Sequence, residues 1–160
     1  MPNARRARQI IDQVAYATVS TVSPEGMPWN SPVFTAFDAD YTFYWGSHRD
    51  AQHSRNIRAN GRGFLVVYNS MVPPGQGEGV YIEASCAELV DEAEKRRAHE
   101  LIRLRRLPIP YWKLEQVLGD TPIHLYRAVP QIVWMNDEGS RDGHYIDTRT
   151  EISLTEHRRG

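Results

Sequence analysis

The pattern of hydrophobic and polar positions predicts a mainly β protein with a few inserted helices. Apolar residues alternate with polar ones, or run together with aromatic and β-branched residues, in short segments typical of strands. These segments are Tyr16–Val22, Pro28–Phe37, Tyr41–Trp45, Phe64–Tyr68, Val80–Val90 and His124–Met135, which is bent at Pro130, with Tyr145–Leu154 as a further terminal strand. Strands and helices do not alternate strictly, so we expect six or seven antiparallel strands in a small closed or split β-barrel, which hides the sheet edges.

Helical spacing of apolar residues predicts an N-terminal helix over Ala4–Val14 and a long helix over Asp91–Leu107. The long helix has acids in its first turn and bases in its last, and Leu101, Ile102 and Leu104 would form its buried stripe. Other predicted elements are a helical turn within Tyr111–Leu118, turns at 23–26, 38–40 and 136–143, and a mobile Pro/Gly-rich loop over Met71–Gly79.

The length and the net charge of the chain favour a single globular domain that binds neither nucleic acid nor an anionic membrane. The 160 residues fit a single domain over 1–160, with a tail from Thr155 to Gly160 that we expect to fray. The formal net charge is -1, so charge gives no reason to expect binding to nucleic acid or to an anionic membrane. Cys86, the single cysteine, falls within a strand pattern and fits a core residue of a protein from a reducing compartment. No apolar run approaches the roughly 20 residues that span a bilayer, so we expect a cytoplasmic protein.

A short helix is predicted to follow the strand Tyr41–Trp45 and to run through Arg58. Either Ser47 or Asp50 can cap its N-terminus. The pair Asn60-Gly61 would end it, since glycine readily adopts the left-handed conformation found after a helix. This strand-to-helix junction is the most informative stretch of the chain.

Three basic residues lie in or beside the first turn of that helix, where the helix dipole makes cations unfavourable. A bound anion would relieve this conflict, and the aromatic strand before it could flank the ring to which a phosphate belongs. The alternative is an ordinary solvated helix whose own counter-charge is Asp50. The candidate phosphate ligands are Ser47, Arg49, His53, Ser54 and Arg55.

The sequence gives less support for a metal site, a nucleic-acid site or a catalytic nucleophile. The six histidines show no metal-ligand spacing, so we expect no metal site. The cations Arg103, Arg105 and Arg106 already have a dipole reason to occupy the last turn of a helix, so they do not predict nucleic-acid binding. We expect Tyr111, Trp112 and Tyr126 in the core or at a subunit interface, and we identify no catalytic residue.

Several weak motifs, in their order and spacing, make the chain resemble the pyridoxamine 5′-phosphate oxidase-like flavoproteins, which have the FMN-binding split β-barrel fold. The resemblance covers roughly Ile10 to Met135. The motifs are Thr18-Val19-Ser20-Thr21, Pro24-Glu25-Gly26-Met27-Pro28, Phe43–Ser47, His53-Ser54-Arg55-Asn56-Ile57 with Asn60, and Gly79–Glu83.

The resemblance implies a six- to seven-stranded antiparallel split β-barrel of Greek-key type. It also implies a homodimer with flavin mononucleotide (FMN) at the subunit interface. It implies that the phosphate lies at the junction Ser47–Arg55 and that the isoalloxazine ring lies along the second and third strands. The residues expected along the ring are Asn30, Ser31, Pro32, Val33, Tyr44 and Trp45, and Trp134 is the residue expected from the partner subunit.

Two departures bear on the activity. The chain offers His53-Ser54 where the oxidases place a basic pair on the phosphate, and His157 has no Arg two residues before it, so the substrate-binding Arg-x-His motif is missing. We therefore expect an FMN-dependent oxidoreductase that transfers hydride from NAD(P)H to a small molecule, without pyridoxamine phosphate oxidase activity. The alternatives are a deazaflavin-dependent reductase, which Arg49, Arg55, Arg58 and Arg62 leave open, and a non-catalytic protein that binds flavin or haem.

Overall fold

The computed structural model describes residues 2–155, and the side chains of these residues other than 2, 138, 140, 141 and 145. Within this range the chain forms three α-helices, one 3-10 helix and eight strands. The helices are α1 (Pro2–Gln13), α2 (Gln52–Asn60), α3 (Glu92–Arg106) and the 3-10 helix η1 (Leu114–Gln116). The strands are β1 (Tyr16–Val22), β2 (Pro28–Phe34), β3 (Ala36–Phe37), β4 (Phe43–His48), β5 (Arg62–Tyr68), β6 (Gly79–Glu88), β7 (Ile123–Arg141) and β8 (His144–Ile152).

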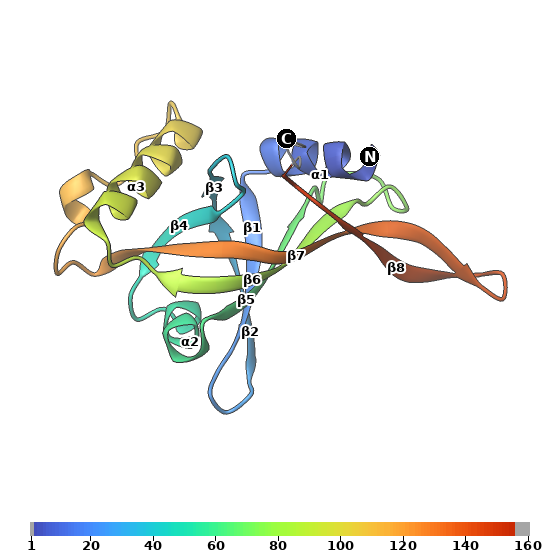
Figure 1. Ribbon diagram of the computed structural model, residues 1–160, viewed down its shortest axis with the longest axis horizontal. Helices are drawn as coiled ribbons and strands as arrows, with labels where there is room; N and C mark the ends of the chain where they lie inside the picture. Colours follow the sequence, from blue (N-terminus) through green and yellow to red (C-terminus); the bar gives the residue numbers. More distant parts are fainter. Residues whose placement is uncertain (1, 156–160) are drawn as a thin grey trace, which may run out of the picture.

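All eight strands belong to one sheet, in which every pair is antiparallel (Figure 1). The strand order is β2-β1-β5-β6-β7-β4-β3, and β8 pairs with β7 outside this path. The sheet curls so that β2 contacts β4, although the two strands lie near opposite ends of this order. The predicted split β-barrel is confirmed, with eight strands instead of six or seven.

Sequence periodicity gave the wrong bounds in two places, and the first of them accounts for the eighth strand. The segment Pro28–Phe37 is divided at Thr35, and the short strand after it turns to pair with β4. Strand β7 does not end at Met135 but continues to Arg141, so the predicted polar turn over 136–143 is wrong. The turn is the pair Asp142-Gly143, with φ of 53° and 77°, which matches the two-residue turn that joins antiparallel strands.

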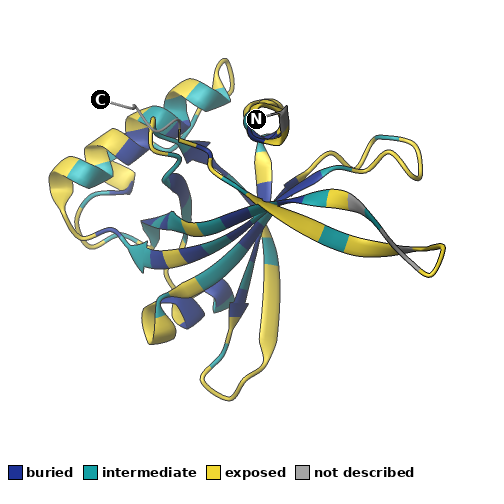
Figure 2. Cartoon of the chain, turned by 45° about the vertical axis from the view of Figure 1, so that its right-hand side comes forward, coloured by how far each residue is buried: buried dark blue, intermediate teal, exposed yellow. Residues whose placement is uncertain are grey.

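The inner face of the sheet encloses the main hydrophobic core (Figure 2). Alternate residues of β1, β5 and β6 point into it, and the rings of Trp45 and Tyr126 stack there with centroids 5.9 Å apart. Helix α1 lies at one end of this core and α2 at the other (Figure 1). Cys86 is buried in the same core, as predicted.

Helix α3 packs against the other face of the sheet, over β3, β4 and β7, and builds a second core with Tyr44, Leu89 and Leu125. Asp91 caps this helix by accepting a hydrogen bond of 2.7 Å from the Glu94 N–H. The predicted buried stripe is wrong at Leu104, which is 49% exposed. The fully or nearly buried positions of the helix are Ala98, His99 and Ile102.

Arg105 connects α3 to the C-terminus of α1. Its Nη2 donates to the carbonyl oxygens of Ile11, Asp12 and Val14, at 2.7, 3.2 and 3.1 Å. The guanidinium also lies over the Phe37 ring, 4.8 Å from its centroid. A cation at a helix C-terminus satisfies carbonyl groups that have no partner within the helix, so Arg105 has a structural role.

The remaining predictions concern the ends and the loops. The predicted helical turn within Tyr111–Leu118 is the 3-10 helix η1, and the loop over Met71–Gly79 is irregular through residue 78. Residues 156–160, which include His157 and most of the tail expected to fray, lie outside the described residues. No helix within 2–155 is long and apolar enough to cross a membrane.

Candidate functional site

The candidate site is the junction at which β4 ends and α2 begins. Helix α2 lies beneath one end of the curled sheet, beside the loop that leaves β4 (Figure 1). Ala51 is its N-cap residue, and among the described residues no side chain caps it. The prediction that Ser47 or Asp50 is the cap is therefore wrong, because α2 begins only at Gln52. The first N–H groups of α2 thus have no side-chain cap, as at the helix ends that bind anions in other proteins.

The C-terminus of α2 is built as the sequence predicts. Gly61 follows the helix with φ of 68°, and its N–H donates to the carbonyl oxygen of Ile57 at 2.8 Å. The Asn60 side chain fixes the next turn, donating to Val22 O at 2.9 Å and accepting from the Arg62 N–H at 3.0 Å. The local sequence thus determines where α2 ends more firmly than where it begins.

Ser47 and His53, two of the predicted phosphate ligands, lie next to each other at the junction. The His53 Nε2 and the Ser47 hydroxyl are 2.8 Å apart, which joins the end of β4 to the first turn of α2. His53 is buried, and this burial lowers the pKa of its imidazole below the ordinary value. The ring is therefore neutral at neutral pH, so it adds no full charge to the positive end of the helix.

Arg49 and Arg55 carry the positive charge of the junction. Arg49 Nη1 donates to the carboxylate of Asp120 at 3.0 Å, and Asp120 is 94% exposed. Arg55 Nη1 donates to the carbonyl oxygen of Asp50 at 2.8 Å, and its Nη2 donates to the side-chain oxygen of Gln52 at 2.5 Å. Both arginine side chains are exposed, so each could exchange its present partner for an anion in solvent.

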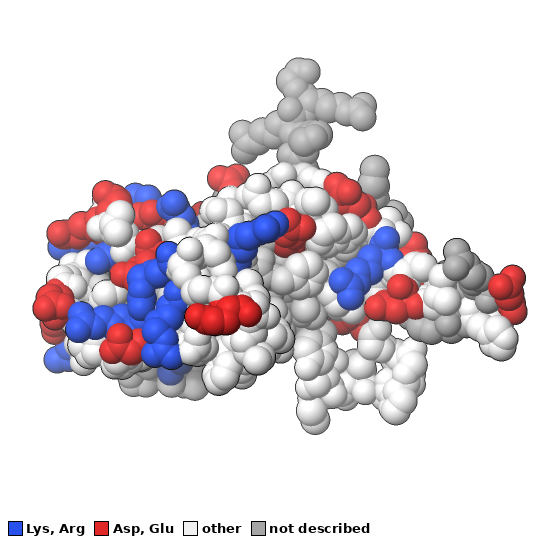
Figure 3. Space-filling view, turned by 90° about the horizontal axis from the view of Figure 1, so that it is seen from below, with Lys and Arg blue, Asp and Glu red and all other residues white. Residues whose placement is uncertain are grey.

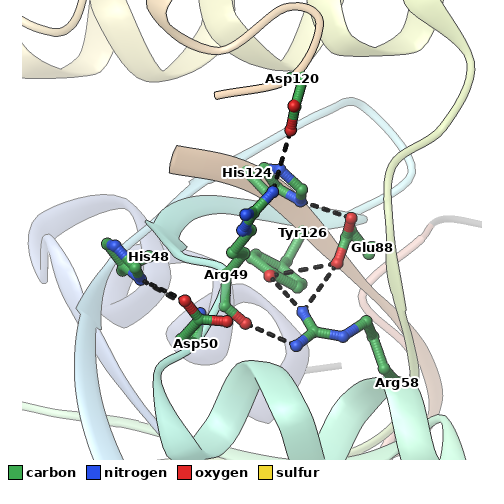
Figure 4. A network of polar contacts seen from close by, with 8 residues as sticks. All are labelled: His48, Arg49, Asp50, Arg58, Glu88, Asp120, His124 and Tyr126. Atoms are coloured by element: carbon green, nitrogen blue, oxygen red, sulfur yellow. Dashed lines mark hydrogen bonds and ion pairs between the residues drawn. The ribbon is translucent and has the colours of Figure 1, made fainter. Parts of the chain in front are cut away.

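A network of polar side chains supports the junction from behind (Figure 4). Glu88, the last residue of β6, accepts hydrogen bonds from His124 Nδ1 at 2.5 Å and from Arg58 Nη1 at 3.0 Å. The Tyr126 hydroxyl lies 3.3 Å from the same carboxylate and 3.3 Å from Arg58 Nη1. Burial acts to raise the pKa of Glu88, but the hydrogen bonds from Arg58 and His124 outweigh it and hold that pKa below its ordinary value.

The sequence alone did not reveal this network. The sequence predicts Arg58 only as a basic residue near the junction, and it predicts no role for Glu88 or His124. The three residues come from α2, β6 and β7, and Glu88 lies 30 positions from Arg58 and 36 from His124. Only the strand register, which places His124 opposite Ser47, brings them to one side of the sheet. No local signal in the sequence could have identified them.

The remaining predicted phosphate ligand, Ser54, lies inside the fold. Its side chain is completely buried on the inner side of α2, near the hydroxyl of Tyr126. Burial raises the pKa of that hydroxyl above its ordinary value. Two residues predicted along the ring are also buried: Trp45 in the main core and Tyr44 in the second core. Both faces of β4 are covered. A flavin ring could therefore contact the main chain of this strand or its exposed end more easily than the side chains of Tyr44 and Trp45.

Strand β2 presents more surface. Asn30 and Pro32 are exposed, Ser31 is half-buried and Val33 is buried in the main core. The Ser31 hydroxyl accepts a hydrogen bond of 3.2 Å from the indole N–H of the exposed Trp29. Strand β2 contacts both β4 and α2, so it lies beside the junction.

Trp134 does not join these residues in one subunit. It lies on the outer face of the sheet, where its ring stacks on Phe64 with centroids 6.2 Å apart. Tyr81 is its partner across the β6–β7 pair, and Val66 is the partner of Tyr81 across the β5–β6 pair. All four side chains are only half-buried. The outer face is thus an aromatic surface separate from the junction.

Figure 3 shows the charges on the face that carries α2. Lys and Arg side chains gather on the half of this face that holds the helices, interspersed with Asp and Glu. The pattern agrees with the ion pairs Arg49–Asp120 and Arg58–Glu88 and with the overall charge near zero. The junction is a local group of cations, and it is not part of a broad basic surface.

Comparison with known proteins identifies the family. The profile of the pyridoxamine 5′-phosphate oxidase family matches residues 4–127, so the chain belongs to that family. The match includes the whole junction and the network behind it. No curated protein sequence matches the chain.

Solved structures share the fold at low sequence identity. A FAD-binding protein from Mesorhizobium loti is 17% identical with a TM-score of 0.61, over 82% of this chain and 92% of that one. A proposed 5-nitroimidazole antibiotic resistance protein from Bacteroides thetaiotaomicron is 15% identical with a TM-score of 0.68, over 82% of this chain and 81% of that one. A haem-binding protein from Mycobacterium smegmatis is 18% identical with a TM-score of 0.65, over 94% of this chain and 57% of that one. At these identities the comparison establishes the fold alone.

The buried imidazole of His53 predicts a pH-dependent stability. Its pKa is lowered in the native state, so between pH 7 and that lower value the unfolded chain binds a proton that the native chain does not. Stability should therefore fall as the pH drops through about 6.5, by up to about 1.4 kcal/mol per pH unit. Urea denaturation at about pH 7.5 and about pH 5.5 measures this loss.

Two variants identify the group responsible for that loss. His53→Gln should lose less stability between the two pH values than the wild type. His144→Gln, which removes an exposed histidine at the start of β8, should keep the wild-type dependence. Equal pH dependence in the wild type and His53→Gln would show that the buried imidazole is not the titrating group.

Proposed function

We propose that the junction between β4 and α2 binds the phosphate of FMN. The observation that carries this proposal is the uncapped N-terminus of α2, with Arg49, His53 and Arg55 beside it. A phosphate monoester carries close to two negative charges at neutral pH, and two exposed guanidiniums with free helix N–H groups match that charge. The donor set of this chain therefore fits the phosphate end of the coenzyme.

Only some of the residues expected along the isoalloxazine ring are accessible on the surface beside the junction. Asn30, Ser31 and Pro32 of β2 are accessible, whereas Val33, Tyr44 and Trp45 are buried. We infer that β2 supplies the contacts from this subunit and that a second subunit covers the rest of the ring. Flavin, when bound, supplies the two-electron redox chemistry, and the protein orients it and excludes competing reactions.

We infer that the partner that covers the rest of the flavin ring is a second copy of the chain. The outer sheet face carries the half-buried side chains of Phe64, Val66, Tyr81 and Trp134, a composition typical of protein interfaces. The hairpin β7–β8 extends beyond the body of the sheet, as Figures 1 and 2 show, and could contact a partner subunit. We propose a homodimer in which this face meets its symmetry mate and brings Trp134 toward the partner's flavin.

The proposed activity is that of an FMN-dependent oxidoreductase that accepts hydride from NAD(P)H and passes it to a small molecule. Hydride transfer needs no general base, which agrees with a junction whose histidine is neutral and bonded to a serine. Family membership supports the proposal, because the matching profile is that of an oxidase. The substrate that accepts the hydride is left open.

A non-catalytic binding protein is the second candidate. The specific observation in its favour is the M. smegmatis neighbour, which has this fold and binds haem. A deazaflavin coenzyme is less well supported, since its additional carboxylates call for more free cations. Arg58, one of the four arginines that could meet them, is already bonded to Glu88 and to Arg49 O.

Flavin titration tests the phosphate site. Stripped protein should bind FMN with micromolar affinity, and Arg49→Ala or Arg55→Ala should weaken this binding about tenfold, the loss of about 1.4 kcal/mol expected from one charge-assisted contact. Riboflavin, which lacks the phosphate, should bind both variants as it binds the wild type. Quenching of flavin fluorescence gives the affinities.

Arg103→Ala is the matched control for the titration. It also removes one guanidinium, but from the exposed Arg103–Glu100 pair on α3. It should leave the affinity for FMN unchanged. Equal losses for FMN and riboflavin, or no saturable binding of FMN or of the deazaflavin coenzyme, would contradict a phosphate site at this junction.

Reduction of the bound flavin separates an enzyme from a binding protein. The FMN-loaded protein under anaerobic conditions should lose its oxidised flavin absorbance when NADH or NADPH is added, faster than free FMN at the same concentration. The absorbance should return when a small electron acceptor is supplied. A loaded protein that neither nicotinamide reduces would favour the binding protein.

The mass in solution tests the homodimer. Sedimentation should give twice the chain mass of 18.4 kDa. Val66→Lys places a charge in the middle of the outer face and should shift the equilibrium toward the monomer, because an unpaired charge is costly at an interface core. Met71→Lys, on an exposed loop, should remain dimeric. A monomeric wild type would exclude the proposed homodimer.

A further inference from the structure

We propose that Glu88 is a positioning residue for the anion site and acts through Arg58 on the main chain of Arg49. The inference rests on the proposed function, since the anion site is the junction described above. It adds Glu88 and His124, which lie on strands remote from the junction in sequence (Figure 4). Its basis is a continuous chain of hydrogen bonds from β7 to the loop before α2.

Arg58 spans α2 from its last turn to the loop that precedes it. Its Nη2 donates to the carbonyl oxygen of Arg49 at 2.6 Å. Its Nη1 donates to Glu88 Oε2 at 3.0 Å and to the Tyr126 hydroxyl at 3.3 Å. One planar guanidinium therefore joins the loop, the helix and two strands in a fixed geometry.

Glu88 holds that guanidinium in place. Its carboxylate is 20% exposed and receives His124 Nδ1 on one oxygen and Arg58 on the other. A half-buried carboxylate with a donor on each oxygen has little freedom to rotate. The position of Arg58, and through it that of the loop, thus depends on an acceptor at the end of β6.

Both main-chain groups of Arg49 are fixed, and its side chain is not. The Arg49 N–H donates to Pro122 O at 2.8 Å, and the Arg49 carbonyl accepts from Arg58. The guanidinium of Arg49 pairs with Asp120, which is 94% exposed, a contact that a ligand can displace. The network therefore fixes the position of the Arg49 main chain. The exposed ion pair with Asp120 leaves the Arg49 guanidinium free to reach an anion.

The network matters because α2 has little apolar contact with the fold. Its buried residues are His53, Ser54, Asn56 and Ile57, and three of these four are polar. Hydrogen bonds, which depend on direction, must therefore fix the helix and the loop before it. If Arg58 loses its carboxylate, the loop can shift, and a small displacement of the donors is enough to weaken a charge-assisted site.

Ligand affinity in a double-mutant cycle tests the inference. Glu88→Gln keeps the shape of the side chain but removes the charge, and Arg58→Met removes the hydrogen bonds of the guanidinium. Each should weaken FMN binding by about five- to tenfold, and the double variant should bind no more weakly than Arg58→Met alone, because both changes break one chain of contacts. The titrations are run well below the unfolding temperature of each variant.

Glu94→Gln is the matched control. Glu94 also forms a half-buried ion pair, with Arg127 at 2.7 and 2.8 Å, but from α3 on the other face of β7. Its loss should lower stability and leave the affinity for FMN unchanged, and its effect on stability should add to that of Arg58→Met. If Glu88→Gln binds FMN like the wild type, or if Glu94→Gln weakens binding equally, the inference is overturned.

Amide hydrogen exchange tests the same inference without a ligand. Glu88→Gln and Arg58→Met should speed exchange in the segment 48–55, and Glu94→Gln should not. Unchanged exchange in that segment would overturn the inference. If the wild type binds no FMN, the proposed function fails, and exchange alone decides whether Glu88 positions the loop. If Glu88→Gln does not fold, Arg58→Met decides by the same two measurements.

Discussion

The fold depends on closing the two ends of a curled sheet. A sheet that wraps around its own core still exposes that core at both ends, and here α1 and α2 cover them (Figure 1). Helix α1 does so with Ala7, Ile10 and Ile11, as an amphipathic helix should. Helix α2 has a single buried aliphatic side chain, Ile57, and otherwise offers polar groups to the barrel end.

The polar character of α2 explains why the site lies at this end of the barrel. Two of the three buried polar side chains of the helix, His53 and Asn56, have hydrogen-bond partners, which matters because an unpaired polar group destabilises the fold. The Asn56 side chain donates a hydrogen bond to Thr21 at 3.0 Å and accepts one from Gln52 at 2.8 Å, and His53 is hydrogen-bonded to Ser47. The bonds that close the barrel therefore also bring the strand end, the loop and the helix start together. Structural closure and the candidate anion site are built from the same residues.

The sequence predicted the parts of the fold that depend on local patterns. Alternation gave β1 and most of the strands, and Asp91 and Gly61 mark helix ends that the structure confirms. It failed for the second half of β7, where the polar stretch after Met135 carries no apolar signal and is a strand only because β8 pairs with it. It also failed for the cap of α2, since nothing local sets how many residues separate β4 from the helix.

The same distinction holds for the site. Ser47 and His53 are six positions apart and could be placed together from a strand-to-helix pattern. Glu88 and His124 could not, because their meeting depends on the register of β6, β7 and β4. Burial of Tyr44 and Trp45 was equally hidden, since β4 has the pattern of an ordinary aromatic strand until α3 is known to cover its other face.

The network also limits the charge that the junction can offer to a ligand. Arg58 lies close to the site but is neutralised by Glu88, and His53 is kept uncharged by burial. Arg49 and Arg55 are left, each exposed and held by a partner that an anion could replace. Two available cations balance a single phosphate monoester, whereas a coenzyme with several further carboxylates would bring more negative charge than these residues can neutralise. This balance is the physical reason to favour FMN over a deazaflavin coenzyme at the junction.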